Sequence, residues 1–333
     1  MKRIAIIGAG SWGTALSIVA GRAGHEINLW SRNDRVVDEI NHGHVNSAYL
    51  KSFVIPDKVR ATAEFADALS GADLVLLASP SHVTRELLMR MLANLEPQMI
   101  FVSATKGIEI ESGKRISEVV GEVVGTQFEP RFVCLSGPSF AQEVVAGQPT
   151  AVVAASVNHD DSLLVQKELS YDNLRIYTNA DVVGTEIGGA VKNVMAIASG
   201  MVTGLGFGTN SVAALITRGL SEIARLALAQ GALQETLMGL AGLGDLVLTC
   251  TGGLSRNRHV GIELGKGRRL EDIVKEMHEV AEGVKTTLAV RTLAMKLAIE
   301  MPITNEVHAV LYEGKSALDA ANILMTRPLR SEI

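Results

Sequence analysis

A glycine-rich turn near the start of the chain constrains the fold more than any other feature. The apolar run Ile4-Ala5-Ile6-Ile7 leads directly into Gly8-Ala9-Gly10-Ser11-Trp12-Gly13, and residues 14–20 then have the composition of a helix. A strand, a glycine turn and a helix in this order form the first unit of a dinucleotide-binding fold. Because the GxGxxG pattern stands between these two elements, the sequence predicts a dinucleotide site there.

Each glycine of this turn has an expected role. Gly8 would permit the tight turn, Gly10 would let the backbone approach a pyrophosphate, and Gly13 would let the helix pack closely on the strand. The helix that follows would direct its first N–H groups towards the phosphates.

Composition limits the class of protein. A chain of 333 residues suits two domains, and 47% hydrophobic but only 4% aromatic residues are typical of helices packed on a parallel sheet. The formal net charge of −5 argues against nucleic-acid binding, which needs a basic face. Cys134 and Cys250 lie in apolar or small-residue runs, so we expect buried thiols in a reducing compartment, the cytoplasm.

One long segment without charged residues invites a membrane interpretation. Residues 193–217 carry no charge, but four glycines interrupt them: Gly200, Gly204, Gly206 and Gly208. A pair of buried helices joined by a glycine loop explains the segment better than a membrane span. We therefore expect no stable membrane insertion.

The order of predicted elements indicates two parts. Strands are predicted at residues 4–7, 26–30, 74–78, 100–103, 132–136, 150–154 and 175–178, with helices at 82–92, 116–124 and 162–169 between them. This alternation predicts a Rossmann-like, doubly wound and mostly parallel sheet. Helical patterns then cover residues 183–203, 210–230, 269–276, 284–299 and 305–311. We expect a dinucleotide-binding domain at residues 1–185 and a helical substrate domain at 186–333.

The end of the second strand bears on the choice of nicotinamide cofactor. NAD-specific folds place an acidic residue there to bind the ribose 2′-hydroxyl. This chain has Arg32 instead, with Arg35 nearby, and arginine suits a 2′-phosphate. The alternative is that Arg32 is only a solvated loop charge. The sequence favours NADP and leaves NAD use open.

Two charged residues in the second half lie among glycine and apolar neighbours. Lys192 is flanked by such residues on nearly every helical face, and Asp245 follows the glycine-rich run at residues 239–244. Lysine is almost never buried unless it is paired or functional. A purely structural ion pair between Lys192 and Asp245 is the alternative to a catalytic site.

A third polar cluster, Ser255-Arg256-Asn257, precedes a predicted helix. Ser255 alone is most simply an N-cap. With Arg256 and Asn257 beside it, the same helix start would bind a phosphate or carboxylate.

Together these motifs make the chain resemble the bacterial type of NAD(P)-dependent glycerol-3-phosphate dehydrogenase over essentially its whole length. Besides the glycine turn, the resemblance rests on Ala104-Thr105-Lys106-Gly107, Leu135-Ser136-Gly137-Pro138-Ser139-Phe140-Ala141, Ala190-Val191-Lys192-Asn193, Gly242-Leu243-Gly244-Asp245-Leu246 and Ser255-Arg256-Asn257.

The resemblance implies roles for individual residues. Lys192 corresponds to the catalytic lysine of the family. The implied substrate-binding residues are Lys106, Gly137, Ser139, Lys192, Asp245, Ser255, Arg256 and Asn257. The implied cofactor-binding residues, with Gly8, Gly10 and Gly13 of the turn, are Ser11, Trp12, Arg32, Lys106, Ala141, Arg256, Val280 and Glu282. NADP, with NAD as the second choice, is the expected cofactor, and no metal is expected.

The family reaction agrees with these residue types. Hydride transfer to the ketone of dihydroxyacetone phosphate builds negative charge on the carbonyl oxygen, which a lysine can stabilise and protonate. The product, sn-glycerol 3-phosphate, would serve glycerophospholipid synthesis. A 3-hydroxyacid dehydrogenase on the same architecture and a non-catalytic NADP-binding sensor remain alternatives. The Ala- and Gly-rich helical part is compatible with a homodimer, although the sequence does not determine the oligomeric state.

Overall fold

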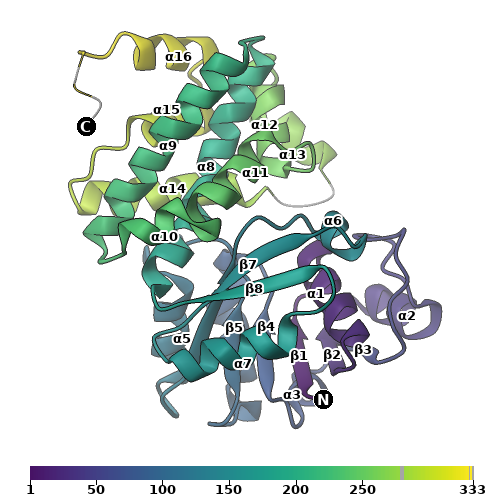
Figure 1. The fold of residues 1–333 in the computed structure, drawn as a ribbon. Helices are drawn as coiled ribbons and strands as arrows, with labels where there is room; N and C mark the ends of the chain where they lie inside the picture. Colours follow the sequence, from purple (N-terminus) through teal and green to yellow (C-terminus); the bar gives the residue numbers. More distant parts are fainter. Residues whose placement is uncertain (278–280, 330, 332–333) are drawn as a thin grey trace.

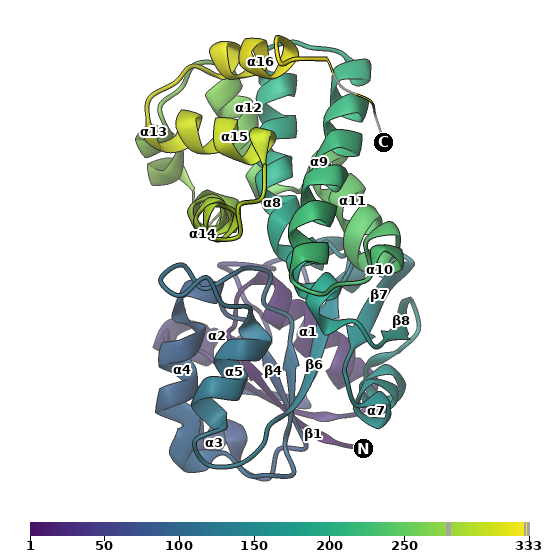
Figure 2. The same ribbon diagram turned by 90° about the vertical axis from the view of Figure 1, so that its left-hand side faces the viewer.

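The computed structural model describes residues 1–277, 281–329 and 331, which form two stacked parts. Figures 1 and 2 show a sheet covered by helices at one end of the molecule and a group of helices at the other end. We call residues 1–180 the sheet region and the described residues from 181 onward the helical region. The first strand begins at Arg3, the last strand ends at Asn179, and the first helix of the helical region begins at Val182. The predicted domain boundary after residue 185 stays a prediction.

The sheet region contains one eight-stranded sheet. Its order is β3-β2-β1-β4-β5-β6-β7-β8, and every neighbouring pair is parallel except β6 and β7. The predicted Rossmann-like sheet is therefore confirmed. The strands are β1 Arg3–Ile7, β2 Glu26–Trp30, β3 Val59–Thr62, β4 Leu74–Leu77, β5 Ile100–Ser103, β6 Arg131–Ser136, β7 Thr150–Ala155 and β8 Leu174–Asn179.

Strand β3 is the one strand that the sequence analysis missed. It has only four residues, alternates Val59 and Ala61 with Arg60 and Thr62, and lies at the edge of the sheet. A strand this short gives two apolar positions, which is too weak a pattern to detect.

Helices cover both faces of the sheet. One face packs against α1 Ser11–Arg22, α2 Asp34–Gly43, α6 Ala141–Val145 and α7 His159–Leu169. The other face packs against α3 Phe65–Leu69, α4 Thr84–Met91 and α5 Ile116–Val124. The helix predicted at residues 82–92 is divided into the short 3₁₀ helices η1 Ser81–Val83 and η2 Leu92–Asn94 with α4 between them.

Helix α8, Val182–Gly204, is the centre of the helical region. All of its residues from Gly184 to Met201 are buried, and the surrounding helices bury their apolar side chains against it. These helices are α9 Thr209–Ala229, α10 Gln234–Met238, the π-helical turn η3 Leu240–Gly244, α11 Asp245–Thr251, α12 Arg256–Gly265, α13 Leu270–Glu276, α14 Glu282–Lys296, α15 Pro302–Tyr312 and α16 Ala317–Met325.

The uncharged segment at residues 193–217 forms parts of α8 and α9 with a glycine loop between them, as predicted. The expectation that both helices are buried is wrong for the first half of α9, where Ala213 and Ala214 are exposed and Leu215 and Ile216 are only partly buried. Among the described residues, no helix combines the length and the apolar composition needed to cross a membrane.

Glycines allow α8 and α12 to pack in backbone contact. A Cβ atom on Gly261 of α12 would overlap the carbonyl oxygen of Ile197, and one on Gly200 of α8 would overlap that of Arg258. Gly204 and Gly265, one turn further along each helix, repeat the arrangement. This contact sets the position of the start of α12 relative to the middle of α8.

We expect Gly261→Ala to lower the free energy of unfolding by about 3 kcal/mol, because the added methyl group forces two backbones apart. Gly121→Ala on α5 is the matched control, since a Cβ there would meet nothing within 4 Å. That change should be neutral or stabilise by about 0.5–1 kcal/mol. Urea unfolding of both variants checks this expectation, and equal effects would contradict it.

Candidate active site

The glycine turn has the geometry that the sequence predicts. Gly8 has φ +120°, and a Cβ on it would lie 2.9 Å from the carbonyl oxygen of Ala78 at the end of β4. A Cβ on Gly13 would overlap the carbonyl oxygen of Gly8, whereas one on Gly10 would meet nothing within 4 Å. Gly8 and Gly13 therefore serve the close packing of the turn, while Gly10 faces open space.

The start of α1 fits a bound dinucleotide. Gly10 is the N-cap and supplies no side-chain hydrogen bond to the first turn, which begins at Ser11. Helix N-termini of this kind attract phosphate groups. In addition, the indole nitrogen of Trp12 is buried without a hydrogen-bond partner among the described residues. A bound cofactor would occupy the open space at Gly10 and would supply an acceptor for the buried indole N–H of Trp12.

A buried carboxylate lies between two lysines at the junction of the two regions. Asp245 at the start of α11 accepts a hydrogen bond from Lys192 Nζ at 2.6 Å and another from Lys106 Nζ at 2.8 Å. The side chain of Asp245 is only 1% exposed and that of Lys192 only 7%. Lys106, in the loop after β5, also donates to the carbonyl oxygen of Gly137 at 2.9 Å. The structure therefore brings together four of the residues predicted from the sequence.

Thr249 is a member of this cluster that the sequence analysis missed. Its hydroxyl oxygen accepts a hydrogen bond from Lys192 Nζ at 2.7 Å, and the hydroxyl donates to the backbone carbonyl oxygen of Asp245 at 2.6 Å. The available signal was its spacing from Asp245, because residues four apart on a helix lie on the same face. Thr249 holds the ammonium group of Lys192 from a second side.

The glycine-rich run before Asp245 packs against α8. A Cβ on Gly188 of α8 would lie 2.7 Å from the carbonyl oxygen of Ala241, and one on Gly242 would overlap that of Leu237. The run forms the π-helical turn η3, a type of irregularity that is frequent at functional sites. Gly188 therefore lets the turn approach α8, and Gly242 lets the turn fold closely onto the end of α10. Together these contacts place Asp245 beside Lys192.

Burial changes the pKa of Lys192. Loss of hydration lowers it from 10.5 to about 8, against the negative charge of Asp245, which favours the ammonium form. The nearby charge of Lys106 lowers it further. A pKa in this range suits a group that acts as a general acid or base.

Glu282, at the start of α14, lies near the same cluster. Burial raises the pKa of its carboxyl group to about 7, and the charges of Arg256, Lys192 and Lys106 oppose that rise. The structure thus brings Glu282 and Arg256 together with the two lysines, as the resemblance implies. Val280, the other residue expected in this segment, lies outside the described residues.

Two asparagines connect the helices around the site. Asn257 Nδ2 donates to Asn193 Oδ1 at 2.9 Å, and Asn257 Oδ1 accepts from the backbone N–H of Gly283 at 2.9 Å. Asn193 in turn donates to the backbone oxygen of Lys106 at 3.4 Å. Asn257 therefore joins α12 to α8 and α14. Ser255 is the N-cap of α12 and accepts from the N–H of Arg258 at 3.2 Å, which confirms its interpretation as a cap.

The remaining predicted residues lie on loops of the sheet region. Ser139 donates to the carbonyl oxygen of Gly137 at 3.0 Å, and Ala141 is the first residue of α6. Arg32 follows β2 and is exposed, with no hydrogen bond or ion pair to another described residue. Arg35 differs, since its Nε atom is paired with Glu39 at 3.0 Å. Both arginines are exposed, but of the two only Arg32 lacks a partner among the described residues.

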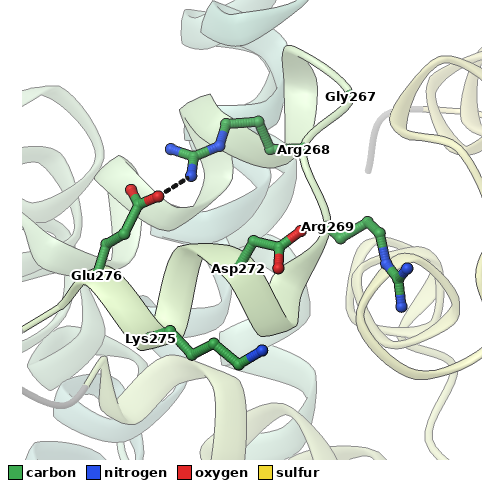
Figure 3. A pocket seen from close by; sticks show the side chains of 6 residues that line it. All are labelled: Gly267, Arg268, Arg269, Asp272, Lys275 and Glu276. Atoms are coloured by element: carbon green, nitrogen blue, oxygen red, sulfur yellow. Dashed lines mark hydrogen bonds and ion pairs between the residues drawn. The ribbon is translucent and has the colours of Figure 1, made fainter.

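A surface hollow elsewhere in the helical region does not belong to this site. Figure 3 shows it between the residues that line it, Gly267, Arg268, Arg269, Asp272, Lys275 and Glu276. Arg268, one of the cations that line it, is paired with Glu263 and Glu276. The hollow contains none of the residues predicted for the site.

The fold and the site define a class. A mostly parallel sheet with a dinucleotide-type glycine turn, combined with a buried lysine of lowered pKa, is the arrangement of a nicotinamide-dependent dehydrogenase.

Comparison with known proteins identifies the family. Models of the N-terminal and C-terminal parts of NAD-dependent glycerol-3-phosphate dehydrogenase match residues 3–162 and 181–322. NAD(P)+ glycerol-3-phosphate dehydrogenase of Koribacter versatilis is 55% identical over 100% of this chain and 99% of its own length. That of Myxococcus xanthus is 49% identical over 99% of each. The chain belongs to the NAD-dependent glycerol-3-phosphate dehydrogenase family, which confirms the resemblance found in the sequence.

Solved structures agree with this assignment. The crystal structure of glycerol-3-phosphate dehydrogenase from Coxiella burnetii has 41% sequence identity and a TM-score of 0.94, covering 98% of this chain and 99% of that one. A ketopantoate reductase from Ralstonia eutropha, at 18% identity and a TM-score of 0.60, covers 96% of this chain and 99% of its own. The second likeness concerns the fold alone.

The pairing of Asp245 with two lysines predicts that removing the carboxylate costs more stability than removing Lys192. Asp245→Asn leaves a buried ammonium without a counter-charge and should lower the free energy of unfolding by about 3–5 kcal/mol at pH 7. Lys192→Met leaves Asp245 paired with Lys106, so we expect a loss below about 2 kcal/mol. Urea unfolding of the two variants compares them, and a larger loss for Lys192→Met would show that Lys106 does not compensate.

Proposed function

We propose that this protein reduces dihydroxyacetone phosphate to sn-glycerol 3-phosphate with NAD(P)H, and catalyses the reverse oxidation. The single observation that carries the proposal is the buried Lys192, held by Asp245 and Thr249 with a pKa of about 8 in a member of this family. We also propose that the product supplies glycerophospholipid synthesis.

Lys192 is the proposed proton donor to the carbonyl oxygen. Bound NAD(P)H supplies the hydride to the ketone carbon. As charge grows on the oxygen, the ammonium of Lys192 stabilises it and then protonates it, and in the oxidation the neutral amine accepts that proton. Asp245 and Thr249 orient Nζ, and Lys106 adds a second positive charge to the site.

Residues at the start of α12 are proposed to bind the substrate phosphate. Arg256 is the first residue of that helix, and Ser255 and Asn257 flank it. A planar guanidinium at a helix N-terminus provides both directed donors and a favourable dipole for a phosphate. Gly137 and Ser139, beside Lys106, would contact the rest of the small substrate. Binding at the phosphate would orient the ketone for hydride transfer.

The proposed cofactor site extends from the glycine turn to α14. Gly8, Gly10, Ser11, Trp12 and Gly13 would hold the pyrophosphate end, and Arg32 the 2′-phosphate of NADP. The other proposed contacts are Lys106, Ala141, Arg256, Val280 and Glu282. The open position at Gly10 and the exposed, unpaired Arg32 support this arrangement. We propose that NADP is preferred and that NAD is also used.

Two other functions are distinguishable by one assay. A 3-hydroxyacid dehydrogenase would oxidise NAD(P)H with a keto acid, and a cofactor-binding sensor would oxidise it with neither substrate. The proposed enzyme consumes NAD(P)H, with falling nicotinamide absorbance, when dihydroxyacetone phosphate is added.

We further propose cytoplasmic localisation, no nucleic-acid partner, a dinucleotide-binding domain at residues 1–185 and a helical domain at 186–333.

We also propose a homodimer. An exposed apolar patch favours self-association, and α9 has apolar residues that remain at least partly accessible. These residues are Ala213, Ala214, Leu215 and Ile216. Light scattering at several concentrations tests the assembly.

Lys192→Met tests the catalytic role. If Lys192 acts mainly in the transition state, kcat should fall by about 10²–10⁴-fold while NADPH affinity barely changes. Single-turnover hydride transfer, NADPH binding and the melting temperature are measured on the same variant. A folded variant that transfers hydride at nearly the wild-type rate would contradict the assignment of Lys192 as the proton donor.

Arg32→Ala tests cofactor selection. Loss of one charge-assisted contact to the 2′-phosphate should weaken NADPH binding by about 1.5–3 kcal/mol and leave NADH nearly unaffected. The KM values for the two cofactors provide the comparison. Equal increases would mean that Arg32 does not discriminate between them.

A further inference from the structure

The ends of three adjacent strands lead to the same edge of the sheet. Strand β1 lies between β2 and β4, and its last residue, Ile7, pairs with Trp30 of β2 and Leu77 of β4. All three strands are parallel, so their carboxyl ends open on one edge. The glycine turn follows β1, Arg32 follows β2, and His82 of η1 follows β4. Arg32 and His82 therefore flank the glycine turn from its two sides.

The first turns of α14 approach this edge from the helical region. A Cβ on Gly107 would overlap the hydroxyl of Ser81 in η1 and would lie 3.7 Å from the hydroxyl of Thr286 in α14. Thr286 is buried in this contact. Because Ser81 precedes His82 and Thr286 follows Lys285, this contact brings together the two chain segments that carry His82 and Lys285.

Hydrogen bonding fixes α14 in this position. The N–H of Gly283 is held by Asn257, and a Cβ on Gly283 would lie 2.7 Å from the carbonyl oxygen of Asn193 on α8. Lys285 is therefore carried by a helix that is anchored at its start to α12 and α8. Its own side chain is exposed.

Lys285 and Arg32 both lie close enough to His82 to affect its pKa. Burial lowers the pKa of His82, and the positive charges of Lys285 and Arg32 lower it further. Among the described residues no carboxylate opposes this effect, and none of the three side chains forms a hydrogen bond or ion pair with another described residue. The lowered pKa leaves the imidazole of His82 neutral at pH 7, so the unpaired positive charge is that of Arg32 and Lys285. Unpaired positive charge of this kind favours a bound anion.

We propose that Lys285 of α14, together with His82 of η1, contacts the 2′-phosphate of NADP alongside Arg32, so that the helical region takes part in choosing the cofactor. The inference rests on the proposed role of Arg32 and extends it to two further residues.

The position of the cluster distinguishes the 2′-phosphate from the pyrophosphate. The pyrophosphate has its own expected place at Gly10 and the N-terminus of α1, whereas the loop after the second strand meets the adenosine ribose in this fold. A 2′-phosphate carries close to two negative charges at pH 7, which one exposed arginine neutralises only in part. Lys285 and the imidazole N–H of His82 would supply the remaining partners of the 2′-phosphate.

Equilibrium binding to the full-length protein tests this proposal. Calorimetric Kd values for NADPH, NADH, adenosine 2′,5′-bisphosphate and adenosine 5′-monophosphate are measured for wild type, Lys285→Ala, His82→Asn and Arg32→Ala. Lys296→Ala is the matched control, because Lys296 is the last residue of the same helix. Since Lys285 is exposed, its removal should leave the melting temperature unchanged.

We expect Lys285→Ala to weaken NADPH and adenosine 2′,5′-bisphosphate by about 5- to 20-fold, with less than about a twofold change for NADH and adenosine 5′-monophosphate. His82→Asn should act in the same direction more weakly, and Lys296→Ala should have no effect. Equal weakening of NADPH and NADH by Lys285→Ala would place Lys285 at a part shared by both cofactors and overturn the proposal. So would an unchanged Kd for NADPH.

Arg32→Ala separates this inference from the function on which it rests. If Arg32→Ala is selective for NADPH while Lys285→Ala is not, the role of Lys285 is wrong and the role of Arg32 stands. If neither variant is selective, the proposed 2′-phosphate site itself is wrong.

Discussion

The ion pairs of Asp245 with Lys106 and Lys192 are the interaction on which the site depends. Lys106 belongs to a loop of the sheet region, whereas Lys192 belongs to α8 of the helical region. A buried carboxylate is costly unless it is fully paired, and here two ammonium groups satisfy both of its oxygens. The same contacts connect the two parts of the chain and orient the proposed proton donor, so structural and catalytic roles of the Lys192–Asp245 pair are compatible.

The backbone packing around α8 makes this arrangement possible. Gly188 lets the turn before Asp245 approach α8, and Gly200 and Gly261 let α12 do the same. The two contacts hold Asp245 and Arg256 at fixed positions relative to Lys192. Rigid placement of this kind lowers the reorganisation needed when charge develops on a substrate.

Features that depend on local pattern were predictable from the sequence. The glycine turn stands between a β-branched run and a helix, and α5 was predicted at its observed bounds because its valines recur at helical spacing. Lys192 and Asp245 were found because charged residues are conspicuous among glycine and apolar neighbours. In each of these cases the signal lies within a few residues of the feature itself.

Features that depend on long-range contact were not predictable. The sequence around Thr249 does not distinguish it from other helical threonines, and its role depends on the contact with Lys192 of α8. Strand β3 likewise depends on its pairing with β2. Lys106 was assigned through the family resemblance, but its second hydrogen bond, to Asp245, joins residues 139 positions apart. The exposed face of α9 was not predicted, because the apolar character of its residues does not determine whether other elements bury them.

The pH dependence of single-turnover hydride transfer tests the central claim, that burial lowers the pKa of Lys192 and that Asp245 limits this decrease. With the pKa of Lys192 at about 8, the rate of ketone reduction should fall as pH rises through 8, because the ammonium form is the donor. Alcohol oxidation should rise over the same interval, because the neutral amine is the acceptor. Asp245→Asn removes a charge that raises this pKa, so both transitions should move about one to two pH units lower. Transitions that stay near pH 8 in the folded variant would contradict the account.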